Sequence, residues 1–320
     1  MKIAFVGKGG SGKTTLTSLF AAYLAHTGRP VLAIDADINQ HLAVGLGASE
    51  EDAAALPTLG EHLDLIKDHL RGDNPRITST DAMIKTTPPG RGSRLIRPFE
   101  DNPITHACFR DVGGVRLGVT GRFDEDDLGV SCYHSKVGAA ELLLNHFVDG
   151  ADEYVVLDMT AGADAFASGL FTRFDVTFLV CEPTLRSVGV YRQYANYAHD
   201  FGVRLAVVGN KTTDTEDVEF LRQQVGEDLL CWLTGSGHVR AAERGRARPI
   251  SALEQENLAA LATILATVDS TPRDWDRFHR QAVEFHLRNA RSWANNRTGQ
   301  DLAAQIDPDY IPGPAALADA

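Results

Sequence analysis

Cysteine is scarce and dispersed in this sequence. Its 320 residues include four cysteines, which lie far apart and form no C-x-x-C pair: Cys108, Cys132, Cys181 and Cys231. A disulfide framework needs a dense set of cysteines, and a self-contained zinc ribbon needs closely spaced pairs. The sequence therefore argues against both, and it favours a reducing compartment such as the cytoplasm.

Long hydrophobic runs and an excess of basic residues are also absent. No apolar stretch approaches the ~20 residues that span a bilayer, and the first residues have the pattern of a strand rather than of a cleavable leader. Acidic residues outnumber basic ones by 43 to 31, which gives a net charge of −12. Such a chain has no general attraction for a phosphate backbone. We therefore expect no membrane partner, and nucleic acid is disfavoured.

Short apolar segments alternate with helical patterns along most of the chain. An apolar run at residues 2–6 is followed by a helical pattern of apolar residues through residue 24. Further apolar runs occur at residues 31–34, 115–120, 154–158, 176–181 and 204–210. Strands separated by helices indicate β-α-β crossovers. The sequence therefore predicts an α/β fold with a doubly wound, mainly parallel sheet flanked by helices.

One enlarged domain accounts for the length. Residues 1–268 are predicted to form it, with residues 48–114 as an insertion whose second half is rich in Pro, Gly, Arg and Thr. Residues 269–294 have the pattern of an amphipathic helix with an aromatic stripe. We favour docking of this helix on its own domain over presentation to a partner. Residues 295–320 are expected to form a flexible, loosely attached tail.

A glycine-rich segment follows the first predicted strand. Residues 7–14 read GKGGSGKT, which matches the P-loop pattern G-x-x-x-x-G-K-[ST] between a strand and a helix. Backbone N–H groups that can converge on a polyphosphate belong to Gly9, Gly10, Ser11 and Gly12. Lys13 is predicted to bridge the β- and γ-phosphates, Thr14 to ligate Mg²⁺, and Thr15 to reach the α-phosphate. The segment thus predicts a nucleotide site.

Acidic residues after two later strands would complete such a site. Asp35 and Asp37 follow the second strand at a spacing of two, so their carboxylates lie on one side of the chain. Asp35 is predicted to lie near Mg²⁺ or its waters, although capping of the next helical segment is an alternative for both acids. Asp158 ends the run at 154–158 in the manner of a Walker B acid. Gly162 is placed to present its N–H to the γ-phosphate.

Lys8, the residue after the first glycine of the loop, indicates a particular class of P-loop protein. With Lys8 in front, the string KGGSGKT resembles the deviant Walker A signature of the MinD/ParA/ArsA/NifH class (SIMIBI) of P-loop ATPases. In that class the signature lysine reaches the partner's phosphates in a dimer closed around ATP. The resemblance implies a homodimer in which Lys8, Lys13 and Asp37 are catalytic, with Asp37 orienting the attacking water. A solvated lysine at a turn is the alternative for Lys8.

The resemblance extends to the nucleotide base. Asn210 and Lys211 close the run at 204–210, and the family uses such an asparagine to bind the edge of adenine. A turn-forming asparagine is the alternative. We therefore expect ATP and Mg²⁺ as cofactors, with Asn210 and Lys211 among the nucleotide-binding residues.

The middle of the chain resembles the CooC-type ATPases that accompany nickel insertion into carbon monoxide dehydrogenase. The segment GVSCYH at residues 129–134 is followed by a predicted helix and then by the Walker B run. CooC-type proteins carry a C-x-C pair here, through which two subunits hold one metal, whereas this chain has Cys132 and His134. The resemblance implies Zn²⁺ or Ni²⁺ at a dimer interface, since two C-x-H pairs offer four suitable ligands. A buried cysteine and a helix-flanking histidine are the alternative.

Two functions follow from these resemblances. The first is an ATPase whose dimer closure drives metal delivery or metalloenzyme maturation for an unknown client protein. The second is a MinD- or ParA-like positioning or regulatory ATPase that binds a partner protein in its ATP-closed state. An arginine cluster at residues 240–248 would suit DNA, but such arginines more often form a solvated helix face, which we favour here.

Overall fold

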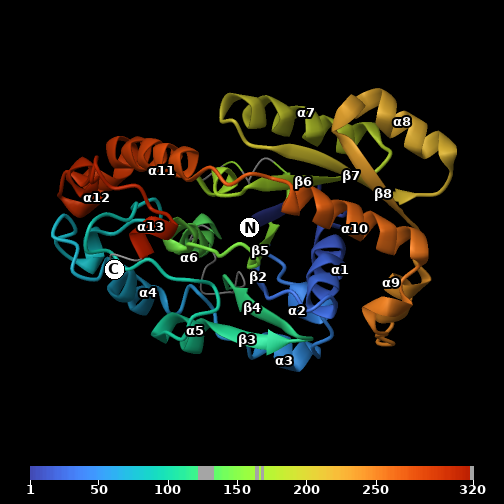
Figure 1. Cartoon of the computed structure of the whole chain (residues 1–320), viewed down its shortest axis with the longest axis horizontal. Helices are drawn as coiled ribbons and strands as arrows, with labels where there is room; N and C mark the ends of the chain where they lie inside the picture. The colour runs from blue at the N-terminus through green and yellow to red at the C-terminus, as the bar shows by residue number, and fades with distance from the viewer. Residues whose placement is uncertain (122–132, 163–165, 167–168, 318–320) are drawn as a thin grey trace.

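A computed structural model describes residues 1–121, 133–162, 166 and 169–317, with the backbone alone at 133–136. Its centre is an eight-stranded sheet in the order β3-β4-β2-β5-β1-β6-β7-β8. The strands are β1 (Lys2–Gly7), β2 (Val31–Ala36), β3 (Phe109–Val112), β4 (Val115–Val119), β5 (Tyr154–Met159), β6 (Val176–Cys181), β7 (Leu205–Thr212) and β8 (Leu229–Thr234). Every neighbouring pair is parallel except β3 and β4. The predicted doubly wound, mainly parallel α/β fold is confirmed (Figure 1).

Helices cover both faces of the sheet. They are α1 (Lys13–His26), α2 (Leu42–Gly45), α3 (Glu50–Ala54), α4 (Leu63–Arg71), α5 (Pro103–Cys108), α6 (Tyr133–His146), α7 (Leu185–Asp200), α8 (Thr215–Val225), α9 (Gly237–Ala242), α10 (Gln255–Asp269), α11 (Trp275–Asn289), α12 (Asn295–Thr298) and α13 (Pro314–Leu317). Single helical turns lie at η1 (Thr80–Ala82), η4 (Gly169–Thr172), η5 (Gly226–Asp228), η6 (Ile250–Ala252), η7 (Ala290–Ala294) and η8 (Leu302–Gln305). Successive side chains of the central strands point to opposite faces of the sheet, so the sheet separates two apolar cores. One core joins the sheet to α4, α6, α7 and α8, and the other joins it to α1 and α10.

Two strands of the sheet were not predicted. β3 lies within the residues assigned to the insertion, so residues 109–112 belong to the sheet instead. Gly113 and Gly114, with φ of +59° and +80°, form the two-residue turn that joins β3 to β4 as an antiparallel hairpin. β8 pairs with β7 and extends the parallel sheet at its other edge.

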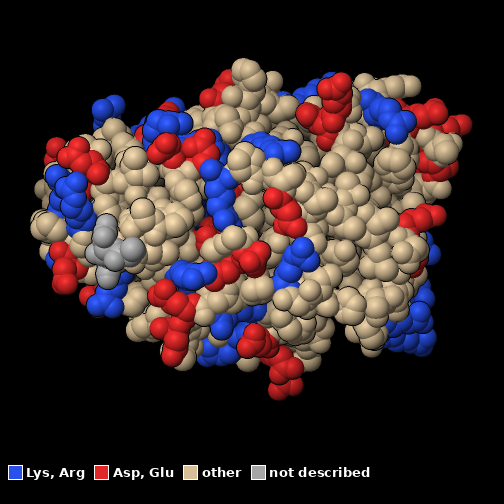
Figure 2. All heavy atoms as spheres, in the orientation of Figure 1, with Lys and Arg blue, Asp and Glu red and all other residues tan. Residues whose placement is uncertain are grey.

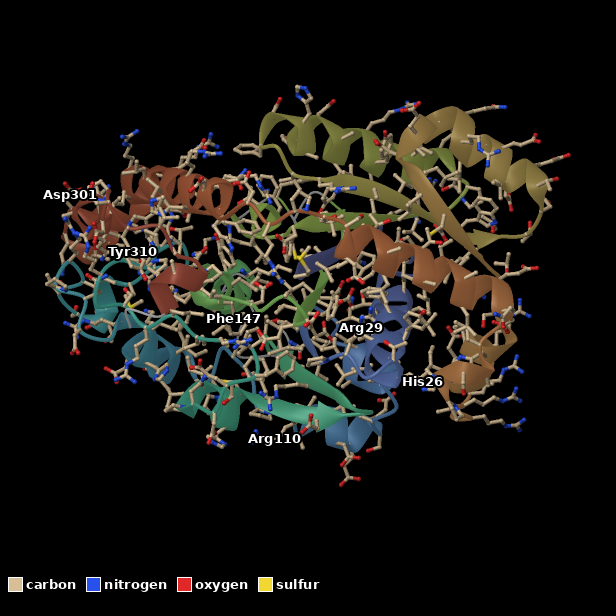
Figure 3. The ribbon with its side chains drawn as sticks, in the orientation of Figure 1. His26, Arg29, Arg110, Phe147, Asp301 and Tyr310 are labelled. Carbon is tan, nitrogen blue, oxygen red and sulfur yellow. The ribbon has the colours of Figure 1, made fainter. Side chains whose placement is uncertain are left out.

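The C-terminal region packs against the rest of the chain. α11 buries Phe278, Ala282 and His286, so it docks on its own domain. The structure differs from the expected loose tail over residues 295–317, because Leu302 is fully buried beside Ala82 of the insertion. In Figure 3, Asp301 and Tyr310 lie at the end of the molecule formed by α11, α12 and α13. The C-terminal region and the insertion therefore share one core.

Charged side chains are interspersed over the face seen in Figure 2, with basic side chains gathered near α9. The arginines of the 240–248 cluster, which begins in α9 and continues beyond it, are exposed. No helix among the described residues has the length and apolar character required to cross a membrane.

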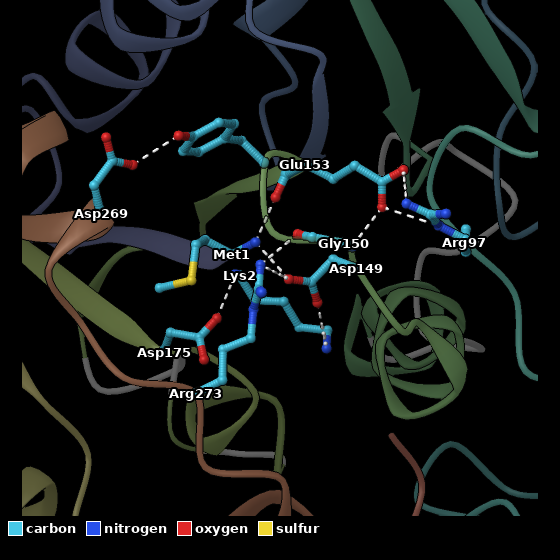
Figure 4. A network of polar contacts seen from close by, with 10 residues as sticks. Met1, Lys2, Arg97, Asp149, Gly150, Glu153, Asp175, Asp269 and Arg273 are labelled. Atoms are coloured by element: carbon cyan, nitrogen blue, oxygen red, sulfur yellow. Dashed lines mark hydrogen bonds and ion pairs between the residues drawn. The ribbon is translucent and has the colours of Figure 1, made fainter. Parts of the chain in front are cut away.

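A buried network of charges joins the start of β1 to the C-terminal region (Figure 4). The Asp149 carboxylate contacts Lys2 Nζ at 2.9 Å, Arg273 Nη2 at 3.0 Å and the α-amino group of Met1. Burial by itself would raise the pKa of Asp149, but these three cations hold the pKa well below its usual value. Trp275, the first residue of α11, lies over the Lys2 ammonium at 4.5 Å from its ring centroid. The network therefore fixes α11 against the sheet.

We predict that Asp149→Asn destabilises the protein by about 3 kcal/mol, because it leaves buried cations without their counter-charge. The measurement is urea unfolding followed by circular dichroism. Asp152→Asn, an exposed change in the same loop, is the matched control. The ionised form of Asp149 stabilises the fold, so its contribution is complete above about pH 4 and is lost as pH falls further. Equal unfolding midpoints for wild type and Asp149→Asn at neutral pH would contradict this role.

Candidate active site

The carboxyl ends of three adjacent strands bring the predicted residues together. β5 pairs with β1 on one side and with β2 on the other, all in parallel. The glycine loop follows β1, while Asp35 and Asp158 are paired across β2 and β5. Because parallel strands end at the same edge of a sheet, residues far apart in sequence share one site.

The glycine loop has a tightly constrained backbone. A Cβ on Gly7 would lie 2.6 Å from the carbonyl oxygen of Val180, and one on Gly12 would lie 2.2 Å from Asn210 Nδ2. Gly12 has a φ of +94° and precedes the first turn of α1, which carries no acidic residue. Backbone N–H groups at this helix start are thus available to an anion, and no neighbouring carboxylate in that turn opposes it.

Lys13 and Thr14 lie among the predicted acids. The buried Lys13 ammonium is 3.6 Å from Asp37 Oδ2. Thr14 Oγ1 donates a hydrogen bond of 2.6 Å to Asp158 Oδ2, and Thr17 Oγ1 donates one of 3.3 Å to Asp158 Oδ1. The structure therefore brings the P-loop lysine, the hydroxyl and both carboxylates into one cluster.

Carboxyl groups outnumber ammonium groups in the cluster around Lys13. Burial raises the pKa of Asp158 to about 7, and Asp37 adds to this shift, while Thr14 and Lys13 oppose it. The pKa of Asp35 is also raised, by burial and then by Asp158. Clustered carboxylates beside a hydroxyl form a set of hard oxygen donors, which is the chemistry that Mg²⁺ prefers. The residues present therefore fit a magnesium–nucleotide complex.

Asp35 is fully buried and is engaged by the backbone. Its Oδ2 accepts a hydrogen bond of 2.9 Å from Leu42 N, the first residue of α2, and its Oδ1 accepts one of 3.1 Å from Asp37 N. The bond to Leu42 fits the alternative in which Asp35 caps the helical segment that follows. The bond to Asp37 N holds the turn that carries the Asp37 side chain. A place for Asp35 near Mg²⁺ or its waters stays a prediction.

Asn210 and Lys211 lie against the glycine loop. Asn210 Nδ2 donates a hydrogen bond of 2.7 Å to the carbonyl oxygen of Ser11, and Lys211 Nζ donates one of 2.6 Å to that of Gly10. Lys211 has a φ of +59°, which is unusual for a residue with a side chain. Both residues therefore belong to the site, while contact between Asn210 and adenine stays a prediction.

Two residues of the site were given no chemical role from the sequence. Glu182, just after β6, accepts from Lys8 Nζ at 3.3 Å and from Lys211 Nζ at 2.9 Å. Burial raises the pKa of Glu182, but the two lysines outweigh this effect and lower it. Thr17 lies three residues after Thr14 on α1, so helical spacing was a usable signal for its contact with Asp158. Glu182 follows a strand that pairs with β1, which only the sheet order reveals.

The remaining predicted residues are less constrained by the structure. Gly162 has a φ of +67°, and Thr15 is half-buried in the first turn of α1. Cys132 and the side chain of His134 lie outside the described residues. Within the described part of the chain, no group of three or more His, Cys, Asp and Glu side chains is arranged to hold a metal ion.

A glycine loop between β1 and α1, with an acid on the adjacent strand bonded to the loop's threonine, defines a P-loop nucleotide-binding protein. Residues 3–272 match the family described as the CobQ/CobB/MinD/ParA nucleotide binding domain, and the chain belongs to this family. It is therefore an ATP-binding NTPase, and ATP hydrolysis is the activity consistent with its family.

Relatives and solved structures agree with this assignment. An ATP-binding protein of Methanocaldococcus jannaschii is 31% identical over 232 residues, covering 72% of this chain and 81% of the relative. The carbon monoxide dehydrogenase accessory protein CooC of Rhodospirillum rubrum is 28% identical over 246 residues, covering 76% and 87%. The fold is similar to MinD with Mg-ADP from Pyrococcus horikoshii (TM-score 0.55, 16% identity, 84% and 96% covered). It is also similar to a ParA family ATPase of Chlorobium tepidum (TM-score 0.57, 15% identity, 83% and 97% covered).

Lys13→Ala is predicted to abolish ATP hydrolysis and to weaken nucleotide binding at least about tenfold, because a charge-assisted contact to phosphate is lost. Phosphate release and fluorescent-nucleotide titration measure the two effects. Arg222→Ala, an exposed change on α8, is the control for loss of a cation elsewhere. Normal hydrolysis by Lys13→Ala would refute the assignment of this site.

Proposed function

We propose that this protein is a Mg²⁺-dependent ATPase switch that closes as a homodimer around ATP. The observation that carries the proposal is the position of Lys8. Its side chain is one-third exposed at the shoulder of the glycine loop, where it pairs with Glu182 and leaves the buried phosphate contact to Lys13. A lysine so placed is available to a second subunit, as the resemblance to the deviant Walker A class implies.

Within one subunit, the site residues divide the work of phosphoryl transfer. Lys13 and the backbone N–H groups of the glycine loop bind the phosphates, and a γ-phosphate would take over the contact that Lys13 makes with Asp37. Asp37 is held by two hydrogen bonds from Asn39 to its Oδ1, so its other oxygen is left to orient a water molecule. Mg²⁺, when bound near Thr14 and Asp158, would supply charge compensation on the phosphates. The Lys8 of a closed partner would stabilise the charge that develops during transfer.

Mixed dimers test whether Lys8 acts across subunits. We expect Lys8→Ala to retain nucleotide binding but lose turnover, because the partner's site lacks its lysine. Asp37→Ala should also bind nucleotide without turnover, because its own site cannot orient the attacking water. In a mixture, the Asp37→Ala subunit supplies Lys8 to the intact Asp37 of its Lys8→Ala partner. About half of randomly mixed dimers then carry one working site, so about a quarter of wild-type activity returns.

The control for the mixing experiment is each variant assayed alone at the same total concentration, with dimers measured by light scattering in ATP. An inactive mixture that still forms ATP-dependent dimers would contradict the transfer of Lys8 between subunits. Full turnover by Lys8→Ala alone would contradict the closed-dimer proposal as a whole.

We further propose that the ATP cycle serves metal delivery or metalloenzyme maturation. Support comes from the similarity to CooC over 76% of the chain and from the C-x-H pair of Cys132 and His134, of which His134 belongs to the first turn of α6. A cysteine and a histidine from each subunit suit Zn²⁺ or Ni²⁺. The similarity of the fold to MinD and ParA proteins supports the alternative, a positioning or regulatory ATPase that binds a partner protein.

Metal content separates these two functions. We expect the ATP-bound dimer to hold one Zn²⁺ or Ni²⁺ and Cys132→Ser to hold none, as measured by elemental analysis after gel filtration. Cys231→Ala, which removes a buried thiol, is the control and is expected to keep the metal. Equal metal content in wild type and Cys132→Ser would remove the metal proposal. Flotation with vesicles or pelleting with DNA only in ATP would then favour the alternative.

A further inference from the structure

A cavity of about 330 Å³ lies at the end of the molecule away from the P-loop. Three segments form it: α4 with the following part of the insertion, α6, and α12 with the turn before it. In Figure 1 α4 and α12 lie at the left end, and α6 lies between them and the central strands. Its size falls within the range of small-molecule sites, and no residue of the nucleotide site lines it.

Basic side chains converge on this cavity. Lys67, Lys85 and Arg297 line it, against the single acidic lining residue Asp81. Lys85 is 4.0 Å from Glu141, whereas neither Lys67 nor Arg297 forms a salt bridge with a described residue. Burial lowers the pKa of Lys67; among the nearby charges Asp64 and Asp81 oppose this shift and Arg297 adds to it. An anion in the cavity would give Lys67 and Arg297 a partner at salt-bridge distance, which no described carboxylate provides.

Apart from Thr298 and Gly138, the rest of the lining is apolar and includes one aromatic ring. Leu63, Met83 and Leu142 contribute to the walls, together with Trp293. The Arg297 guanidinium lies over Trp293, 5.6 Å from the ring centroid, and the indole N–H donates to Asn289 at 2.9 Å. The ring is thus held by its hydrogen bond to Asn289, and it lines the cavity beside the Arg297 guanidinium. A flat apolar group beside an anionic group matches this arrangement.

The cavity depends on the C-terminal region. The match to the nucleotide-binding family ends at residue 272, whereas Trp293, Arg297 and Thr298 lie beyond it. The backbone of this region is secured by Leu302, which is buried with residues of the insertion. The region therefore completes a site that the matched domain does not enclose by itself.

We propose that this cavity binds a small organic anion that joins an aromatic or other flat apolar group to a carboxylate, sulfonate or phosphate. Lys67 and Arg297 bind the anionic group, and Trp293 with the leucine and methionine side chains contacts the apolar part. The site goes beyond the proposed ATPase function and does not depend on it.

The probe for the test is 8-anilinonaphthalene-1-sulfonate, which combines an aromatic frame with one negative charge. It is titrated into the full chain in saturating Mg-ADP, which keeps it out of the nucleotide site. We expect the Lys67→Gln/Arg297→Gln double variant to bind the probe at least about tenfold more weakly, because two charged contacts are lost. Arg291→Gln, an exposed change six residues before Arg297, is expected to bind like wild type.

Two further measurements locate the probe and test the role of its charge. Energy transfer from tryptophan to the probe should fall in Trp293→Phe and persist in Trp232→Phe. N-phenyl-1-naphthylamine, the uncharged analogue, should bind wild type and the double variant equally. Thermal melts check that each variant is folded. Equal sulfonate binding by wild type and the double variant, or unchanged energy transfer in Trp293→Phe, would overturn the proposal.

Discussion

The parallel pairing of β5 with both β1 and β2 is the constraint on which the rest of the structure depends. It places the carboxyl end of each strand at one edge of the sheet, so the glycine loop after β1 meets Asp158 of β5 and Asp37 after β2. The two cores on either side of the sheet hold this order, because the central strands bury both of their faces. Nucleotide chemistry therefore depends on sheet order as much as on the glycine loop itself.

Near the two ends of β1, two buried carboxyl groups have pKa values shifted in opposite directions. At its amino end, the carboxylate of Asp149 is surrounded by cations, and its lowered pKa reflects a network that stabilises the fold. At its carboxyl end, Asp158 is buried beside further carboxylates, and its pKa is raised to about 7. That second arrangement is unfavourable in the folded protein by itself, and an added divalent cation would relieve it. A lowered carboxyl pKa thus marks the structural cluster, and raised carboxyl pKa values mark the candidate site.

The sequence was sufficient for those features that local patterns encode. Strand–loop–helix spacing predicted the glycine loop, and apolar runs ending in acids predicted Asp35 and Asp158. Glu182 was given no chemical role because its contact with Lys8 joins residues 174 apart, and it depends on β6 lying beside β1. The C-terminal region was misjudged for a related reason. Its composition is polar, but a few residues such as Leu302 are enough to anchor it when the insertion offers an apolar partner.

The insertion and the C-terminal region are held rigidly to the ATPase domain, and this restricts what they can do. Arg273 and Trp275 fix the start of α11 at the charge network below β1, while α6 packs in the same apolar core as Val155 and Leu157 of β5. α6 also forms one wall of the cavity through Gly138 and Leu142. α6 packs against β2, the strand that leads to Asp37 and pairs with β5. A ligand that shifted α6 would act on the apolar core that it shares with these strands, so the added segments are better suited to sensing or recognition than to acting as a freely moving arm.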